Sequence, residues 1–445
     1  MEAYVLDYLN FAIRWLHMIA GIAWIGASLY FVWLDSSLLP PKDQPSKDIG
    51  IGGEVWALHG GGFYRAQKFA LAPPELPQPP VPLHWFKWEA YTTWLSGFAL
   101  LVLMYYVQAD VYLIDRSVMD LTPVAAIAVG LGVLARSSIL YDLLCRSPLG
   151  DNEPLLAAIM FVLLGALAYG LTHMFSGRGA FIHFGAVIGT IMVANVFFVI
   201  MPGQRAMVAA KVAGQPVDPA HGLRGKQRSV HNTYFTLPVL FVMISNHHAG
   251  FTGHKHAWAI LMAISLAGAL IRLYSVQSHR GNKRPMLWMT GYGILIALFI
   301  GLFPKPVERV AGAAVKFADV KRVIDAKCTV CHAAAPTFQG FNAPPKNVLL
   351  ETASQIKTLA QQIHQQTVAT RAMPPGNLTR LSDDERRLIG AWFAQGANVQ
   401  GVNVQGANAQ EVNVQGVNAQ GVNAQGANVQ GVNAQGANAP PANPR

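Results

Sequence analysis

The chain has 445 residues, of which 52% are hydrophobic and only 13% are charged. Ordinary globular proteins carry about 25% charged residues, so this composition excludes a set of soluble domains and indicates an integral membrane protein. The 33 Lys and Arg exceed the 23 Asp and Glu by ten. In a membrane protein such an excess usually lies in cytoplasmic loops, so it does not point to nucleic acid as a partner.

Eight apolar segments approach or exceed the ~20 residues that a helix needs to cross the hydrocarbon core. They are residues 11–34, 89–107, 123–144, 154–175, 181–201, 234–246, 258–276 and 287–303. The sixth is the shortest, although it can extend from His231 to His248. We therefore predict an all-α, polytopic bundle of about eight transmembrane helices over residues 1–304.

The basic residues of the loops fall mainly on one side of the membrane if the eight helices alternate in direction. The other side holds only Arg116, Arg178 and Lys255 in its loops. Cytoplasmic loops carry the excess of Lys and Arg, so the N-terminus and everything after Phe303 are predicted to lie outside the cytoplasm. A cleaved signal peptide is the alternative for the first segment, but Glu2 and Asp7 stand where its basic region should be.

Several histidines lie within the predicted spans, where ionisable side chains are costly and are functional candidates. His17 and His183 both fall toward the outer face, and Ala20 and Gly21 leave a flat space beside His17 on its own helix. One interpretation is a b-type haem bound by two such histidines. The other is hydrogen bonding between helices, and the sequence leaves both open.

Two arginines in the spans and one long loop are further candidates. Arg136 and Arg272 could bind an anionic, planar substrate, but snorkelling toward the inner headgroups explains them equally well. Residues 35–87 are predicted to form a long inner loop that contains His59 and His84. Loops of that size are often functional.

Beyond Pro306 the composition changes to a soluble mix and the motif Cys328-Thr-Val-Cys331-His332 follows. C-x-x-C-H is the attachment signature of a c-type haem, in which two thiols bond to the porphyrin and the histidine binds the iron. A redox dithiol or half a zinc site is the alternative, but no second Cys/His pair follows. Met373, on a proline-rich loop, is the predicted sixth ligand of the iron.

The residues around this motif predict a small class I-type cytochrome c domain over 316–396, joined by a linker over 305–315. Its expected helices are Phe317–Lys327, residues 353–370 and residues 382–394, the last opened by a capping box of Ser382 and Glu385. Bacteria attach haem of this type outside the cytoplasm. This agrees with the side that the loop charges predict.

The last segment, residues 397–445, is dominated by a repeated five-residue unit, Gly-(Ala/Val)-Asn-(Val/Ala)-Gln. We interpret this tail as a disordered low-complexity extension. A pentapeptide β-solenoid is the alternative. It is less favoured because the tail would make only about two coils with small inward side chains.

Four segments of the membrane half resemble the bacterial membrane-bound urate oxidases. They are residues 14–26, 59–64, 86–94 and 229–238. In that family an eight-helix domain precedes a c-type cytochrome, which is the order found here, and the resemblance covers about residues 1–396. It implies an all-α membrane domain fused to a cytochrome, in a multi-pass protein of the bacterial inner membrane with both the N-terminus and the cytochrome in the periplasm.

The resemblance also implies an activity: oxidation of urate to 5-hydroxyisourate, with water as the oxygen source and no hydrogen peroxide. Electrons would leave through haem c, held by Cys328, Cys331, His332 and Met373, to a soluble cytochrome c or a terminal oxidase. The candidate catalytic histidines are His17, His183, His59 and His231, and the side of the membrane that holds the urate site is open. The rival interpretation is a quinol-oxidising protein that delivers electrons to the fused cytochrome.

Overall fold

The computed structural model describes residues 2–77, 83–303, 314–338 and 343–399. Residues Met1–Val402 form one compact unit, and the second unit, Asn403–Arg445, falls outside the described residues. The predicted tail therefore lies almost wholly beyond the part of the chain that the structure describes, as does most of the predicted linker.

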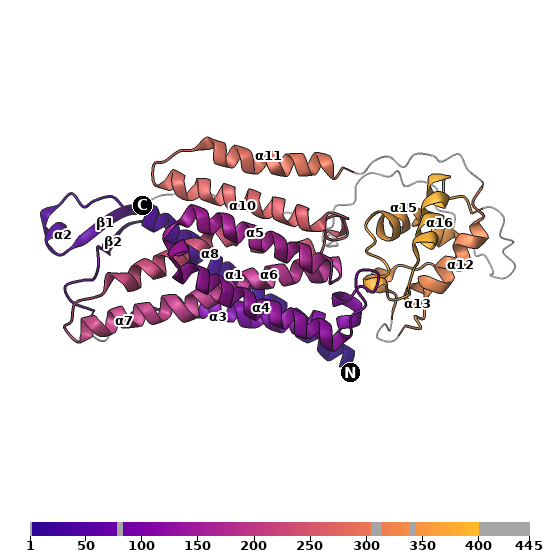
Figure 1. The fold of residues 1–445 in the computed structure, drawn as a ribbon, viewed down its shortest axis with the longest axis horizontal. Helices are drawn as coiled ribbons and strands as arrows, with labels where there is room; N and C mark the ends of the chain where they lie inside the picture. Colours follow the sequence, from indigo (N-terminus) through magenta and orange to yellow (C-terminus); the bar gives the residue numbers. More distant parts are fainter. Residues whose placement is uncertain (1, 78–82, 304–313, 339–342, 400–445) are drawn as a thin grey trace, which may run out of the picture. The chain divides into compact units, whose positions relative to one another are not determined.

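Long apolar helices make up the N-terminal two thirds of the chain and run side by side (Figure 1). They are α1 (Glu2–Ser37), α3 (Trp88–Leu101), α4 (Pro123–Arg146), α5 (Glu153–Thr172), α6 (Gly177–Ala194), α7 (Met201–Val212), α8 (Pro219–Ser245), α10 (Ala257–His279) and α11 (Pro285–Gly301). Two short helices, α2 (Gln44–Asp48) and α9 (Ala249–Thr252), lie in the connections.

Five helices among the described residues are long and apolar enough to cross a membrane, against the eight that the sequence predicts. Three predicted spans miss this standard for separate reasons. The second predicted span is interrupted, because helix α3 gives way to the π-helical turn η1 (Val102–Tyr106). The sixth lies on α8, whose N-terminal half is polar, and the eighth lies on α11, which has only 17 residues. The bundle is thus confirmed as helical and apolar, but the count of eight is not shown.

The prediction of an all-α protein is wrong for the first long loop, which contains a β-hairpin. Strand β1 (Ile51–His59) pairs antiparallel with β2 (Gly62–Phe69). Gly60 and Gly61 join the strands with φ of 58° and 81°. Positive φ at both central residues is the geometry of the two-residue turn that suits the twist of a hairpin. The Gly-Gly pair was the signal for this turn in the sequence.

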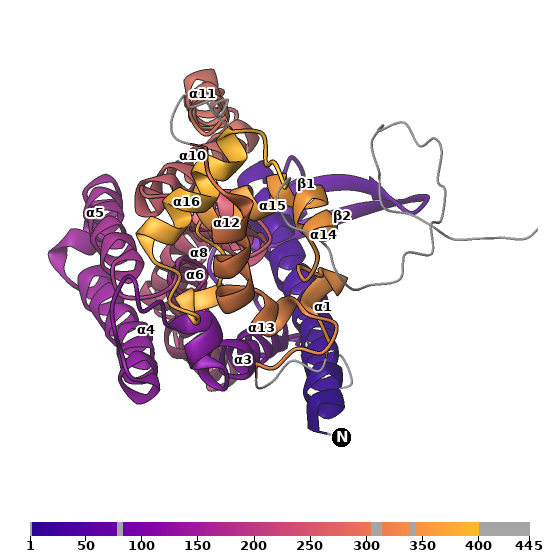
Figure 2. The ribbon, with the colours of Figure 1, turned by 90° about the vertical axis from the view of Figure 1, so that its right-hand side faces the viewer.

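Helix α6 lies at the centre of the bundle. In the view of Figure 2, α5 and α1 lie on opposite sides, with α6 and α8 between them. Phe181, Phe184 and Val187 of α6 are fully buried. A Cβ on Gly185 would come within 2.5 Å of Val242 on α8. Small residues of this kind let helix backbones approach closely, which is how helices pack in a membrane.

Gly150, just after helix α4, makes a similarly close contact with the backbone, from which we predict an effect on stability. A methyl group on Gly150 would overlap the carbonyl oxygen of Cys145. We expect Gly150→Ala to destabilise the bundle by about 1–3 kcal/mol. Gly132→Ala is the matched control, because a Cβ there meets nothing within 4 Å. Thermal unfolding in detergent tests this, and equal transition temperatures for both variants would contradict it.

The C-terminal part of the described chain is a small helical domain. It contains α12 (Phe317–Lys327), α13 (Thr329–His332), α14 (Ala353–Thr358), α15 (Ala360–His364), the π-helical turn η6 (Gln365–Ala369) and α16 (Asp383–Ala394). The capping box of Ser382 and Glu385 is confirmed. The helix predicted over 353–370 is broken, because α14 ends at Thr358 and η6 widens the last turn.

Candidate functional site

The larger cavity of the bundle has a volume of about 1070 Å³ and lies among α5, α8 and α10. Most of its charged and polar lining residues come from the start of α5, the N-terminal half of α8 and the end of α10, and Asp35 of α1 and Tyr141 of α4 join them. They include Glu153, Lys226, Gln227, His231, Tyr234 and Arg280. Apolar residues such as Met160, Phe184 and Met262 line the rest. The cavity therefore has a polar end and a long apolar interior.

A chain of hydrogen bonds leads from a backbone carbonyl to His231 at the polar end. Asn232 Nδ2 donates to the carbonyl oxygen of Met192 at 3.0 Å, and Asn195 Nδ2 donates to Asn232 Oδ1 at 2.9 Å. Asn195 Nδ2 also donates to Tyr141 Oη at 3.1 Å. Tyr141 Oη lies 2.8 Å from His231 Nδ1.

This chain has one direction, because a backbone carbonyl can only accept. The Met192 carbonyl oxygen therefore fixes which atoms of the Asn232 and Asn195 side-chain amides donate and which accept. The Tyr141 hydroxyl accepts from Asn195, so its own hydrogen is free to be donated to His231 Nδ1. A neutral imidazole that accepts at Nδ1 carries its proton at Nε2. His231 is therefore set to present an N–H donor, and it lines the cavity.

Two buried guanidinium groups lie behind the cavity lining, Arg228 against Tyr141 and Arg272 near Tyr234, and neither is itself a lining residue. Arg228 is 3% exposed, binds Asp142 at 2.9 Å and lies over the Tyr141 ring at 5.0 Å. Its Nη1 has no hydrogen-bond partner among the described residues. Arg272 is 8% exposed, and its Nε and Nη2 likewise have none within the described ranges. Buried unpaired cationic donors are costly, so their positive charge favours an anion nearby.

The four predicted catalytic histidines occupy four different environments. His231 lies in the hydrogen-bond chain just described, whereas His59 is exposed at the end of β1. His17 Nδ1 donates to the carbonyl oxygen of Thr93 at 3.0 Å. His183 is fully buried, with Nδ1 donating to the carbonyl oxygen of Gly179 at 2.8 Å and Nε2 3.1 Å from Tyr106 Oη.

A b-type haem on His17 and His183 remains a prediction, although both rings are closely packed in this structure. The His17 ring packs against α3 so closely that a Cβ on Gly97 would lie 2.8 Å from it, and Thr93 lies beside Gly21. The flat space expected next to His17 is thus filled. Both ring nitrogens of His183 already have partners.

Tyr141 and Asn232 are site residues that the sequence interpretation missed. Asn232 lies in the segment 229–238 that carries the family resemblance, beside His231. Polar side chains inside apolar helices are functional candidates, and this rule singles out both Asn195 and Asn232 in the sequence. Tyr141 gave no such signal, because tyrosine also occurs where helices meet the headgroups.

The C-x-x-C-H motif lies at the start of α13, within the C-terminal domain. His332 Nδ1 donates to the carbonyl oxygen of Val348 at 2.9 Å, which leaves the Nε2 lone pair available for iron. The Met373 backbone is braced by a bond from its N–H to Gln366 at 2.9 Å and by Arg386, which donates to its carbonyl oxygen at 3.0 Å. The donor set of one histidine and one thioether fits a haem iron.

Of the two thiols of the motif, Cys328 is buried and Cys331 is partly buried. Burial raises the pKa of Cys328 to about 12 and raises that of Cys331 as well. Redox dithiols and zinc sites use thiolates, which require a lowered pKa. Among the described residues, no three His, Cys, Asp or Glu side chains group as a metal site.

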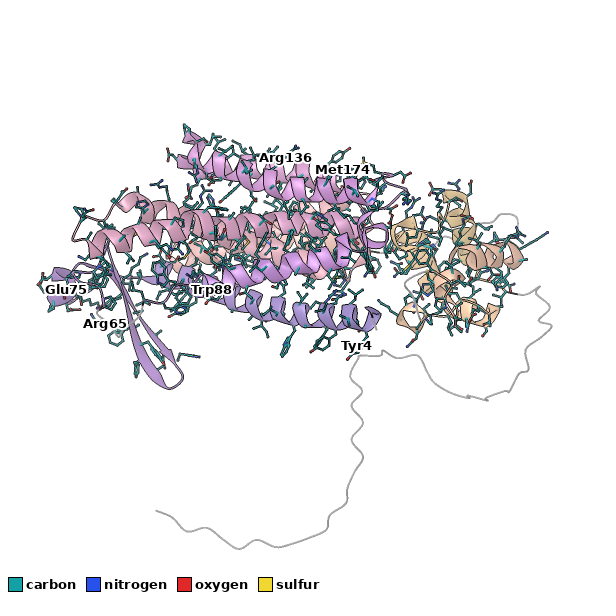
Figure 3. The ribbon with its side chains drawn as sticks, turned by 90° about the horizontal axis from the view of Figure 1, so that it is seen from below. Tyr4, Arg65, Glu75, Trp88, Arg136 and Met174 are labelled. Carbon is teal, nitrogen blue, oxygen red and sulfur yellow. The ribbon has the colours of Figure 1, made fainter. Side chains whose placement is uncertain are left out.

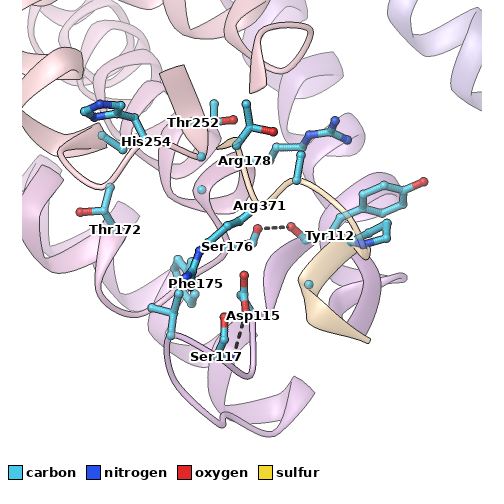
Figure 4. A pocket seen from close by; sticks show the side chains of 18 of the residues that line it. Tyr112, Asp115, Ser117, Thr172, Phe175, Ser176, Arg178, Thr252, His254 and Arg371 are labelled. Atoms are coloured by element: carbon cyan, nitrogen blue, oxygen red, sulfur yellow. Dashed lines mark hydrogen bonds between the residues drawn. The ribbon is translucent and has the colours of Figure 1, made fainter. Parts of the chain in front are cut away.

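A second, smaller cavity of about 270 Å³ involves the loop that carries Met373 (Figure 4). Ser176 Oγ donates to the carbonyl oxygen of Tyr112 at 2.6 Å, and Arg371 lines the same cavity. Gly376 packs directly on the carbonyl oxygen of Ile114. The Met373 loop thus contacts the segment between η2 (Ala109–Leu113) and α4 without an intervening side chain.

Comparison with known proteins identifies the N-terminal two thirds of the chain. A family model described as "Urate oxidase N-terminal" matches residues 3–302. The chain belongs to this urate oxidase family. A second model, "Pentapeptide repeats", matches residues 397–436 in eight copies, so neither match covers residues 303–396. No curated protein and no solved structure matched the chain.

The family match confirms the resemblance of residues 3–302 to urate oxidases and indicates an oxidoreductase. The pentapeptide match falls almost entirely beyond the described residues. The prediction of a disordered tail and its solenoid alternative therefore both remain predictions.

Proposed function

We propose that this membrane protein oxidises urate to 5-hydroxyisourate at the polar end of the large cavity. Urate plus one water gives 5-hydroxyisourate, two protons and two electrons, so no oxygen is consumed and no hydrogen peroxide forms. The family membership supports the substrate. The observation that carries the choice of site is the directed hydrogen-bond chain that ends on His231, next to the buried and partly unpaired Arg228.

The cavity offers urate complementary chemistry. Urate is a planar anion at neutral pH, and an N–H donor forms a charge-assisted hydrogen bond with such a group. In this proposal His231 Nε2 donates to the urate ring and Tyr141 positions His231, while Arg228, which lies over the Tyr141 ring, contributes its positive charge from behind the cavity lining. At the same end Lys226 and Arg280 are positive while Asp35 and Glu153 are negative, and Asp35 pairs with Lys226, so the lining itself carries no net charge.

The C-terminal domain would hold the electron carrier. Cys328 and Cys331 would bond to the porphyrin of haem c, and His332 and Met373 would bind its iron. When bound, such a haem supplies one-electron transfer to a soluble cytochrome c or a terminal oxidase. We further propose eight crossings of the bacterial inner membrane, with the N-terminus and this domain in the periplasm, which the loop charges support.

An anaerobic difference spectrum of membranes that contain the protein tests the activity. Adding urate is expected to reduce a c-type haem and to form 5-hydroxyisourate in proportion. A quinol is the second candidate substrate, because the apolar interior of the cavity could hold an isoprenoid tail. If quinol reduced the haem while urate did not, the protein would be a quinol oxidase of this fold and the urate proposal would fail.

The proposed binding of the haem iron by Met373 leads to a separate prediction. We expect Met373→Ala to keep the covalent haem but to lower its reduction potential, because Met/His ligation raises the potential of a c-type haem. A potentiometric titration followed at the haem bands measures this. Met286→Ala is the control, since that methionine is exposed on α11. An unchanged potential in Met373→Ala would show that another group binds the iron.

A further inference from the structure

The tip of the β-hairpin carries an apolar surface that nothing else in the described chain covers. Trp56, Leu58 and Phe63 are 61%, 67% and 81% exposed. The register pairs Leu58 with Phe63 and Trp56 with Arg65. Alternate residues of a strand share a face, so these three side chains lie together on one face, here called the tip face.

The base of the hairpin is held by the protein, whereas the tip is not. Arg65 binds both Asp43 and Glu54 at 2.5 Å, and Leu39 forms a β-bridge with Glu54. These contacts fix the end of the hairpin nearest to α1. An isolated two-stranded hairpin is marginally stable in water, and exposed apolar clusters mark interaction sites. We therefore expect another molecule to cover the tip face.

The position of the hairpin identifies the lipid bilayer as that occupant. The hairpin follows α1, whose apolar span ends at Ser37, and it projects sideways from the end of the bundle instead of continuing along the helix axes (Figures 2 and 3). Trp88, which is 65% exposed, opens α3 at the same end. Tryptophans at helix ends mark the headgroup level of a membrane.

The size of the tip face argues against a second copy of the chain. Large aromatic side chains bury at most about 250 Å² each, so the three residues offer less than the ~800 Å² per partner of a standard protein interface. Burial in the headgroup region of a membrane requires no such minimum area. Tryptophan and other aromatic side chains are enriched at that level because their rings suit both environments.

We propose that the hairpin lies in the headgroup region of its own membrane, with Trp56, Leu58 and Phe63 facing the acyl chains. This anchor is connected to the large cavity. Asp35 pairs with Lys68 on β2 and with Lys226 at 3.0 Å, and both Asp35 and Lys226 line the polar end of the cavity. A hairpin seated in lipid would thus hold the mouth of the cavity in place.

Site-specific photocrosslinking in native membranes tests the proposal without disturbing the fold. p-Benzoylphenylalanine replaces Phe63 on the tip face or, as the matched control, its neighbour Tyr64 on the opposite face, which is 56% exposed. After irradiation, mass spectrometry of the protein is expected to show phospholipid adducts at position 63 at several times the yield at position 64.

Two results would overturn the inference. Equal lipid yields at the two positions would show that the tip face is not selectively buried in lipid. Crosslinked dimers at position 63 in place of lipid adducts would show that a second copy of the chain covers this face. Neither result depends on the urate activity, so the test stands apart from the proposed function.

Discussion

Replacing His231 with Ala is expected to lower kcat for urate by about 10²–10³-fold, which is the usual loss when one preorganised donor at a reacting centre is removed. The hydrogen-bond chain from Met192 sets His231 to donate from Nε2, and Ala removes that donor. Steady-state kinetics with purified membranes, normalised to haem content, measure the effect.

Matched variants separate this role from a structural one. His231→Gln retains an N–H donor and should recover part of the activity, whereas His221→Ala, on the same helix α8 but outside the cavity lining, should leave kcat unchanged. Tyr141→Phe should lower kcat less than His231→Ala does, because Tyr141 acts only by positioning the ring. Full activity in His231→Ala would remove His231 from the site.

Replacing Cys328 and Cys331 together with Ala is expected to abolish covalent haem attachment, because both thioether bonds require these thiols. The C-terminal domain should also lose stability, since its buried cluster around Phe317, Ile324 and Trp392 is small and the haem would complete it. Peroxidase staining of haem on a denaturing gel measures attachment, and limited proteolysis measures the folding of this domain.

Cys145→Ala is the control for this second experiment. That thiol is free and buried in the membrane bundle, far in sequence from the motif, and its removal should leave haem attachment unchanged. If the double variant of Cys328 and Cys331 kept a covalently bound haem, the assignment of the motif would be wrong. If no haem were attached to the unmodified protein, the proposed electron route would fail while the urate site could still be tested by product formation.

Local signals predicted several elements well. Helix Phe317–Lys327 appears with the predicted bounds, and the capping box of Ser382 and Glu385 opens α16 as expected. Both depend on neighbours within a few residues, such as the bonds between a cap side chain and the first turn. The hairpin was missed because the surrounding loop is rich in glycine and proline, although Gly60-Gly61 is itself a turn signal.

The sequence alone predicted an apolar helical bundle suited to a membrane, the resemblance of its N-terminal part to urate oxidases, and haem attachment at the C-x-x-C-H motif of residues 328–332. These properties are encoded in composition, hydropathy and short spacings. Only the tertiary structure shows how the surroundings of the four candidate histidines differ. Asn195, Asn232, Tyr141 and His231 are contributed by three helices, and their hydrogen bonds form only once α4, α6 with its π-helical extension, and α8 pack together. Contacts between residues distant in sequence depend on helix packing, which no local pattern specifies.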